Sequence, residues 1–184
     1  MDSYDLVLLD NGGKGNTSTV NRGRDRLFSF KKIFNEVFLL VCSSGYFHRK
    51  FHGKTDYGTL KNQEYLQTEI LTPLLDQWFR LNFKRMPDTI NTVMWSNDLE
   101  AIINGVKSGM GVAILPYHSV KKEVDSEALS VIAPSHRQLR REVVLTTIKN
   151  KNPGLTEKAF ASILEKELDK LQAARTSDTP LSAG

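Results

Sequence analysis

Two hydrogen-bonding side chains, Ser96 and Asn97, stand at the start of a predicted helix. The four apolar residues that follow recur at i, i+3, i+4 and i+7, which puts them on one helical face. The first turn of a helix offers free N–H groups and a partial positive charge of roughly half a unit, which suits an anion. We therefore expect Ser96 and Asn97 to bind an anionic ligand; the alternative for Ser96 is a plain N-cap worth about 1 kcal/mol. The apolar residues are Leu99, Ile102, Ile103 and Val106.

The same stretch continues into a turn and a strand that would hold these donors in place. Gly109 stands where helices commonly end in a left-handed residue. Val112–Leu115 is an uncharged apolar run, typical of a strand buried on both faces of a parallel sheet, and Pro116 ends it. The stretch therefore predicts a helix, a tight turn and a buried strand, with the polar start of the helix free to meet a ligand.

A glycine-rich loop, Asp10–Ser18, follows a compact apolar strand at Tyr4–Leu9. Phosphate-binding loops need the order G-x-x-x-x-G-K-[ST] before a helix, and this loop has neither the order nor a helical pattern after it. We expect a surface loop. Asp10 is a candidate ligand contact, because residues just past the carboxyl end of a strand line the ligand crevice in doubly wound sheets.

The histidines His48 and His52 are four residues apart, a spacing that could let them share a metal on a helix. No carboxylate ligand lies beside them, and Arg49 and Lys50 would repel a divalent cation. We expect a solvated basic loop and no metal. No nucleophile–base pair or paired carboxylates can be assembled either, so the sequence predicts neither an enzyme nor a cofactor.

The remaining segments alternate between strand and helix patterns, which indicates an α/β fold. Thr72 and Pro73 would open a helix as its cap and first residue, and Thr156 would cap the last helix. The apolar face of that last helix contains Phe160, Ile163, Leu164, Leu168 and Leu171. Predicted strands cover Glu36–Cys42, Tyr65–Ile70, Asp88–Trp95, Leu129–Ala133 and Arg141–Ile148.

Bulk properties are those of a soluble globular protein. The chain has 184 residues, 40% hydrophobic and 25% charged, with a net charge of +4. Cys42 is the only cysteine, so no intramolecular disulfide can form and a reducing compartment is expected. No basic and apolar leader follows Met1, and no run approaches the roughly 20 apolar residues that span a bilayer. We expect a cytoplasmic protein without a membrane segment.

Four stretches resemble landmarks of the effector-binding domain of LysR-type transcriptional regulators, in the family's order. The stretch from Ser96 to Pro116 is similar to a polar-capped helix, G-x-G turn and proline-ended strand of the family's second subdomain. The others are Phe34–Val41, Asp76–Arg80 and Ala159–Phe160. The resemblance covers most of the chain, from Tyr4 to about Lys170, and it is carried by the order of the four stretches.

The resemblance implies a fold class, namely the two-subdomain α/β fold shared with type 2 periplasmic binding proteins, with crossover strands that act as a hinge. By this reading, residues 1–42 and 140–172 form an incomplete first subdomain and residues 43–139 form the second. We expect residues 173–184 to be a disordered tail, because they are small and polar.

The resemblance also implies a function. The domain would bind a small metabolite, by our expectation an organic anion, in the cleft between its subdomains and so modulate transcription. Ser43 matches a position where family members often carry a hydroxyl that contacts the effector; its alternative is a turn serine bonding its own backbone. Thr68, near a strand end, and Asp10 would be further contacts. A homodimer would be consistent with the family.

Two departures from the family pattern limit what this polypeptide can do. From the family pattern we expect this polypeptide to lack the winged helix-turn-helix and the linker helix of the regulators, together with the opening strand and helix of the first subdomain. We predict that this chain alone does not bind DNA. Specific binding to a promoter-length duplex at physiological salt, measured by a gel-shift or polarisation assay, would contradict this.

Three alternatives remain open at the level of sequence. A solute-binding protein of the same fold would need a signal peptide, which is not seen. An enzyme on this fold would need a catalytic constellation. A truncated remnant of a regulator would bind nothing.

Overall fold

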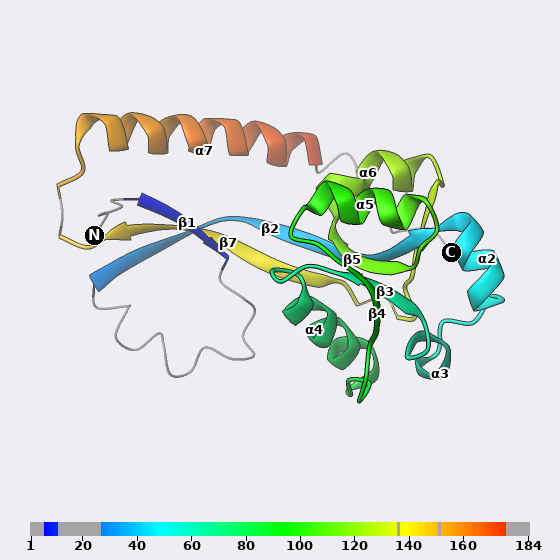
Figure 1. Ribbon diagram of the computed structural model, residues 1–184. Coiled ribbons are helices and arrows are strands. Elements are labelled where there is room, and N and C mark those ends of the chain that lie inside the picture. Colours follow the sequence, from blue (N-terminus) through cyan, green and yellow to red (C-terminus); the bar gives the residue numbers. More distant parts are fainter. Residues whose placement is uncertain (1–5, 11–26, 136, 151, 176–184) are drawn as a thin grey trace. The chain divides into compact units, whose positions relative to one another are not determined.

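The computed structural model describes residues 6–10, 27–135, 137–150 and 152–175 (Figure 1). The chain divides into two compact units. Unit 1 comprises Met1–Asn35 and Arg141–Gly184, and unit 2 comprises Glu36–Arg140. The chain passes between them within two strands, β2 (Phe28–Ser43) and β7 (Leu139–Ile148).

The sheet of unit 2 places three strand ends at one edge. From the second half of β2 the order is β2, β5 (Val112–Pro116), β3 (Glu64–Gln67) and β4 (Asn91–Trp95), and β6 (Leu129–Val131) also pairs with β2. β3 is parallel to β4 and to β5, whereas β2 is antiparallel to β5. The carboxyl ends of β3, β4 and β5 therefore share one edge of this sheet, and the carboxyl end of β2 lies at the opposite edge.

Each of these three parallel strands leads into a helix at the shared edge. α4 (Thr72–Phe83) follows β3, α5 (Leu99–Lys107) follows β4, and α6 (Tyr117–Asp125) follows β5. Within unit 2, α5 and α6 cover one face of the sheet and α4 covers the other (Figure 1). Two shorter helices, α2 (Ser44–Phe51) and α3 (Tyr57–Leu60), come between β2 and β3.

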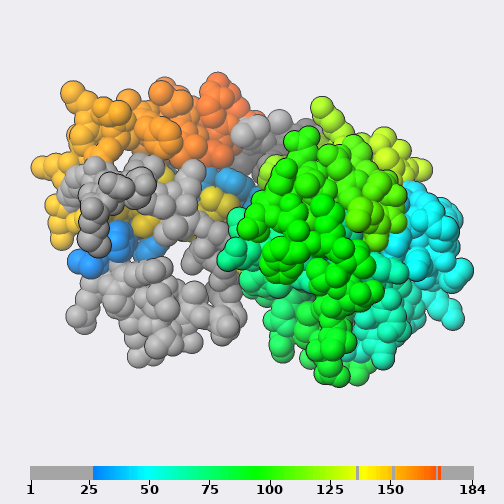
Figure 2. All heavy atoms as spheres, in the orientation of Figure 1, coloured from blue at the N-terminus to red at the C-terminus, as the bar shows by residue number. Residues whose placement is uncertain are grey.

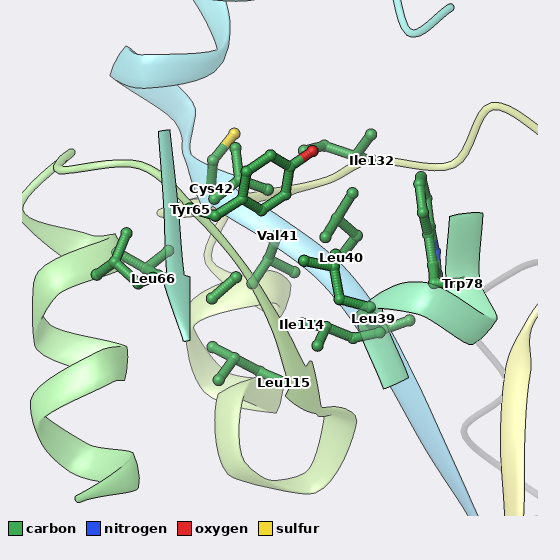
Figure 3. Close-up of a cluster of buried hydrophobic side chains, with 14 of the residues drawn as sticks. Leu39, Leu40, Val41, Cys42, Tyr65, Leu66, Trp78, Ile114, Leu115 and Ile132 are labelled. Atoms are coloured by element: carbon green, nitrogen blue, oxygen red, sulfur yellow. The ribbon is translucent and has the colours of Figure 1, made fainter. Parts of the chain in front are cut away.

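The core of unit 2 is built around β5, all five of whose residues are buried. Leu115 packs in a cluster with Leu40, Val41 and Tyr65 from the neighbouring strands (Figure 3). The predicted buried strand is thus confirmed. Its neighbours are one antiparallel and one parallel strand, so the sheet is mixed and not purely parallel. Cys42 belongs to this core, and burial raises the pKa of its thiol to about 12.

The predicted turn after α5 is also confirmed. Gly109 has φ +80°, and Gly109 N–H and Met110 N–H donate to the carbonyls of Val106 and Gly105 at 3.0 and 3.1 Å. These two bonds are those of a Schellman motif, which ends a helix by satisfying its last carbonyls. Within α5, a Cβ on Gly105 would lie 2.4 Å from Leu66 Cδ2, so glycine there lets the helix approach β3 closely.

The basic segment around His48 is a helix, α2, and not the loop that its composition predicted. Tyr46 and Phe51 are buried on one side of this helix, while His48, Arg49 and Lys50 are exposed. The helix forms because it packs these two aromatic side chains against the core, and its basic residues occupy the solvated side. Among the described residues, no group of three or more His, Cys, Asp or Glu could hold a metal.

Two other predicted boundaries are corrected. β3 stops at Gln67, and its two central residues are both buried, so the alternation read over Tyr65–Ile70 does not describe a half-buried strand. Thr72 is the first residue of α4 and not its cap, since the cap position is Leu71. The Thr72 hydroxyl instead donates to the Thr68 carbonyl at 2.7 Å.

Unit 1 contains a small antiparallel sheet and the last helix. β1 (Leu6–Asp10) pairs with β7, from Leu6 opposite Thr147 to Asp10 opposite Val143, and β7 neighbours β2. Lys31 of β2 forms an ion pair with Glu165 of α7 (Leu155–Arg175) at 2.6 Å. None of the described helices is long and apolar enough to cross a membrane.

The apolar face predicted for α7 is only partly used. Leu164 and Leu168 are half-buried, but Phe160 and Ile163 are 49% and 62% exposed. Helix α7 runs to Arg175, past the start of the predicted tail at Ala173. The rest of that tail and the glycine-rich loop after Asp10 lie outside the described residues.

A tyrosine and a glutamate tie α2 to β3. The Tyr46 hydroxyl contacts the Glu64 carboxylate and Gln63 Oε1, the latter at 3.1 Å, and Lys50 Nζ lies 3.0 Å from Glu64 Oε1. The hydrogen bond from Tyr46, and then that from Lys50, lower the pKa of Glu64 below its ordinary value of 4.5. Burial and the bond to Glu64 raise the pKa of Tyr46.

We predict that Glu64→Gln lowers the free energy of unfolding at pH 7 by about 1–2 kcal/mol. Because the pKa of Glu64 is lowered in the folded state, its stabilisation is present above its ordinary value and is lost as pH falls through the folded-state value. Urea denaturation from pH 7 to pH 3 should show the wild-type advantage shrinking below about pH 4.5. In a Tyr46→Phe background the same substitution should cost less, and equal cost in both backgrounds would contradict the link.

Candidate functional site

The turns after β3 and β4 are joined by hydrogen bonds at the shared edge of the unit 2 sheet. Ser96 N–H donates to the Gln67 carbonyl at 3.1 Å, and Glu69 N–H donates to Asn97 Oδ1 at 3.3 Å. These bonds bring Thr68, Ser96 and Asn97 together. We call these two turns, residues 67–72 and 95–98, the donor edge. Figure 2 shows the green atoms of β4 and α5 at the surface of unit 2.

Thr68 shapes the first of these turns. It is 4% exposed, and its Oγ1 accepts a hydrogen bond from Leu71 N–H at 3.0 Å. Its carbonyl accepts from Thr72 N–H at 3.0 Å and from the Thr72 hydroxyl. A hydroxyl has one donor besides its acceptor sites, so Thr68 can still donate. Its first role is to hold the turn between β3 and α4.

Gln67 connects the same turn to β4, a role that sequence reasoning missed. Its side-chain amide donates to Thr92 Oγ1, and its Oε1 accepts from the Thr72 hydroxyl at 3.2 Å. The residue therefore links β4, β3 and the first turn of α4. A glutamine at the end of a strand carries no sequence signal for such a role, because the pairing depends on the register of β3 with β4.

The helix after β4 is capped by Asp98, so the alternative reading of Ser96 as its N-cap is wrong. Asp98 Oδ1 accepts from Glu100 N–H at 2.9 Å, and the Asp98 carbonyl accepts from Ile102 N–H at 3.2 Å. Ser96 Oγ accepts from Asp98 N–H at 3.1 Å. Both residue types make good caps, and the aspartate carboxylate also complements the positive end of the helix dipole. Ser96 holds the approach to the helix.

Asp98 changes where an anion could bind at this edge. Its carboxylate occupies the N-terminus of α5, and two further exposed carboxylates are Glu69, in the turn after β3, and Glu100, in the first turn of α5. The N-terminus of α6 differs, since its cap position is Pro116 and no side chain caps it. In its first turn, His118 Nδ1 lies 3.2 Å from Glu36 Oε1. Helix α4 also lacks a side-chain cap, but there Thr72 N–H and Leu74 N–H already donate to backbone carbonyls and Pro73 has no N–H. The helix start that suits an anion at this edge is therefore that of α6, which the sequence had not indicated.

A small cavity lies beneath the donor edge, with room for about one water molecule. Its volume is about 10 Å³. The polar part of its lining comes from Gln67, Thr68 and Thr72, and Ile102 and Ile114 contribute to the apolar part. A metabolite would therefore contact the outer surface of the edge, because this cavity is too small to enclose it.

The structure separates Ser43 from the other predicted donors. Ser43 is paired with Leu129 at the opposite edge of the sheet, and its Oγ accepts from Tyr46 N–H at 3.2 Å as the cap of α2. The expected boundary between residues 42 and 43 differs from the observed one, because the chain enters unit 2 after Asn35 and β2 continues to Ser43. The alternative for Ser43, a bond to nearby backbone, is the observed one.

Asp10 is the last residue of β1, in unit 1. It is paired with Val143 of β7 in an antiparallel register. The structure describes its backbone but not its side chain, and so its role as a ligand contact stays a prediction.

The chain matches the family model of the LysR substrate binding domain over residues 17–169. No curated protein sequence matches the chain. The match covers most of the chain, including all of the donor edge.

The similar solved structures include regulatory domains of LysR-type transcriptional regulators. The CrgA regulatory domain, from a LysR-type transcriptional regulator of Neisseria meningitidis, is 17% identical and superposes with a TM-score of 0.61, covering 89% of this chain and 75% of that one. The effector domain of AmpR from Pseudomonas aeruginosa is 14% identical, with a TM-score of 0.63 and coverage of 95% and 76%.

A third similar structure contains a ligand. The CcmR regulatory domain of Synechocystis PCC6803, in complex with 2-PG, is 14% identical, with a TM-score of 0.63 and coverage of 89% and 73%. Together with the family match, these structures confirm the expected α/β fold of the periplasmic-binding-protein-like class.

The observed cap makes a testable prediction about stability. Asp98→Ala should lower the free energy of unfolding by about 1 kcal/mol, since it leaves the Glu100 N–H without its partner. Asp98→Asn should be nearly neutral, because asparagine caps about as well. Ser96→Ala should cost less than Asp98→Ala in the same urea denaturation. If Ser96→Ala lowered the free energy of unfolding more than Asp98→Ala does, Ser96 and not Asp98 would be the cap.

Proposed function

This chain belongs to the family of LysR substrate-binding domains, and we propose that it senses a small organic anion at the donor edge of unit 2. It is thus the effector-binding domain of a LysR-type transcriptional regulator. The family matched and the similar structures are regulator domains and not enzymes. The CcmR domain, which shares the fold, is in complex with 2-PG, and this supports a small-molecule effector for this chain too.

The observation that carries the proposal is the joining of two strand-to-helix turns into one surface. The bonds from Ser96 N–H to Gln67 and from Glu69 N–H to Asn97 fix the two turns to each other. In this arrangement Ser96 keeps its hydroxyl proton, and Asn97 keeps its side-chain NH₂ group, because both side chains act as acceptors in these contacts. In open α/β sheets, ligands bind outside the carboxyl ends of the strands, which is where these donors lie.

The anionic group of the ligand belongs at the start of α6. A helix N-terminus without a side-chain cap offers backbone N–H groups and a partial positive charge. At the start of α5 the carboxylate of Asp98 already takes this place, so a second carboxylate there would be repelled. Ser96 and Asn97, with Thr68 behind them, would then bind the neutral hydrogen-bonding groups of the same ligand.

Binding would act on transcription through a shift in population. A ligand changes the balance between two conformations only by its differential affinity for them. The donor edge would bind the effector and not DNA. That the chain forms a homodimer stays a prediction.

The proposal is tested by thermal shifts of the purified chain with succinate, malate, 2-oxoglutarate, benzoate and inorganic phosphate, against glycerol and putrescine as uncharged and cationic controls. A true effector at about 100 times its Kd should stabilise the protein by about 2.7 kcal/mol. Melting curves that stay flat with every anion would instead favour a remnant that binds nothing.

We predict that Ser96→Ala weakens binding of the stabilising anion about fivefold, the equivalent of one hydrogen bond of about 1 kcal/mol. Isothermal titration would measure the change in Kd. Ser126→Ala is the matched control, because Ser126 follows α6 at its far end and its hydroxyl donates to the Glu123 carbonyl. Equal Kd values for the Ser96 variant and wild type would show that the Ser96 hydroxyl does not bind the ligand.

A further inference from the structure

The hydroxyl of Tyr117 is buried and has no hydrogen-bond partner in the part of the chain that the structure describes. Tyr117 is the first residue of α6, and its side chain packs against the hydrophobic core of unit 2. A buried hydroxyl without a partner costs folding free energy, because it has left water and gained nothing in return. Such a group in a folded protein calls for an explanation.

The other described tyrosines of unit 2 have partners. Tyr65 donates to the Leu60 carbonyl at 2.8 Å, and Tyr57 donates to the Met86 carbonyl at 3.3 Å. Tyr46 contacts Glu64 and Gln63. Tyr117 is therefore the exception among the described phenols of this unit. Since phenylalanine would fill the same space without the cost, the hydroxyl is the feature that needs a function.

The place of Tyr117 in the fold suggests that function. It directly follows Pro116, the last residue of β5, and β5 runs parallel to and beside β3. Tyr117 thus begins its helix at the same edge of the sheet as Thr68, and that helix has no side-chain cap. A phenol can donate one hydrogen bond, and an N-terminal helical turn offers further donors. A partner that suits both is an acceptor oxygen, as in a carboxylate or phosphate.

We propose that Tyr117 is a specificity-determining residue, whose hydroxyl donates to an acceptor oxygen of the effector. This inference rests on the proposed function and names a further contact of the same site. The hydroxyl is unsatisfied in the free domain and becomes satisfied when the ligand binds. Because it is covered in the free structure, contact requires local movement at the start of α6. The unsatisfied hydroxyl raises the free energy of the ligand-free domain alone, and this difference favours ligand binding.

The test compares Tyr117→Phe with wild type in two measurements on the full chain. Without ligand, the variant should melt a few degrees higher, because the unsatisfied hydroxyl is gone. With the anion that most stabilises wild type in the panel above, the variant should bind about 5- to 30-fold more weakly by isothermal titration. The control is Tyr57→Phe, which removes a partnered hydroxyl and should lower the melting temperature while leaving Kd unchanged.

The outcomes separate this inference from the proposed function. If wild type binds an anion and Tyr117→Phe binds it equally well, the inference is wrong and the proposed function stands. If the variant melts lower than wild type without ligand, the hydroxyl has a structural partner and the inference is again wrong. If no anion of the panel binds wild type, the proposed function fails and the inference fails with it. Higher melting combined with weaker binding confirms it.

Discussion

The complete burial of β5 is the constraint on which the rest of unit 2 depends. Five consecutive buried residues without a charge can be covered only by strands on both sides and helices on both faces. The parallel pairing of β5 with β3, and of β3 with β4, then fixes where three helices begin. The proposed ligand contacts at the donor edge and Tyr117 each follow the end of one of these three strands.

The N-termini of α5 and α6 differ in charge, because their cap residues differ. Asp98 places a carboxylate at the start of α5, whereas Pro116 places no polar side chain at the start of α6. Two helices on the same face of the sheet therefore offer different environments to a ligand: a carboxylate caps α5, whereas the carboxylate beside the first turn of α6, that of Glu36, contacts His118. Overall net charge says nothing about such an arrangement, because the effect depends on which side chain sits at each cap.

Much of the fold could be predicted from the sequence, because its signals are local. The apolar run of β5 and the left-handed Gly109 each depend on a few neighbouring residues, and both were expected correctly. The roles of the site residues were harder to predict from the sequence. Asp98 lies two positions after Ser96, and either residue type can cap, so only the hydrogen bonds decide. Ser43 was misplaced because β2 is sixteen residues long and its end lies far from the point of crossover. The role of Gln67 depends on strand register, which one sequence does not contain.

Gly105 joins α5 to β3 so closely that a single methyl group there would collide with Leu66. Helix α5 begins at the donor edge, and β3 ends at it. Any residue larger than glycine at position 105 would have to displace the Leu66 side chain on β3. Because β3 leads directly into Thr68, a larger residue at position 105 should disturb the donor edge although it lies within α5 and not at the edge itself. Glycine at position 105 thus permits the short spacing between α5 and β3.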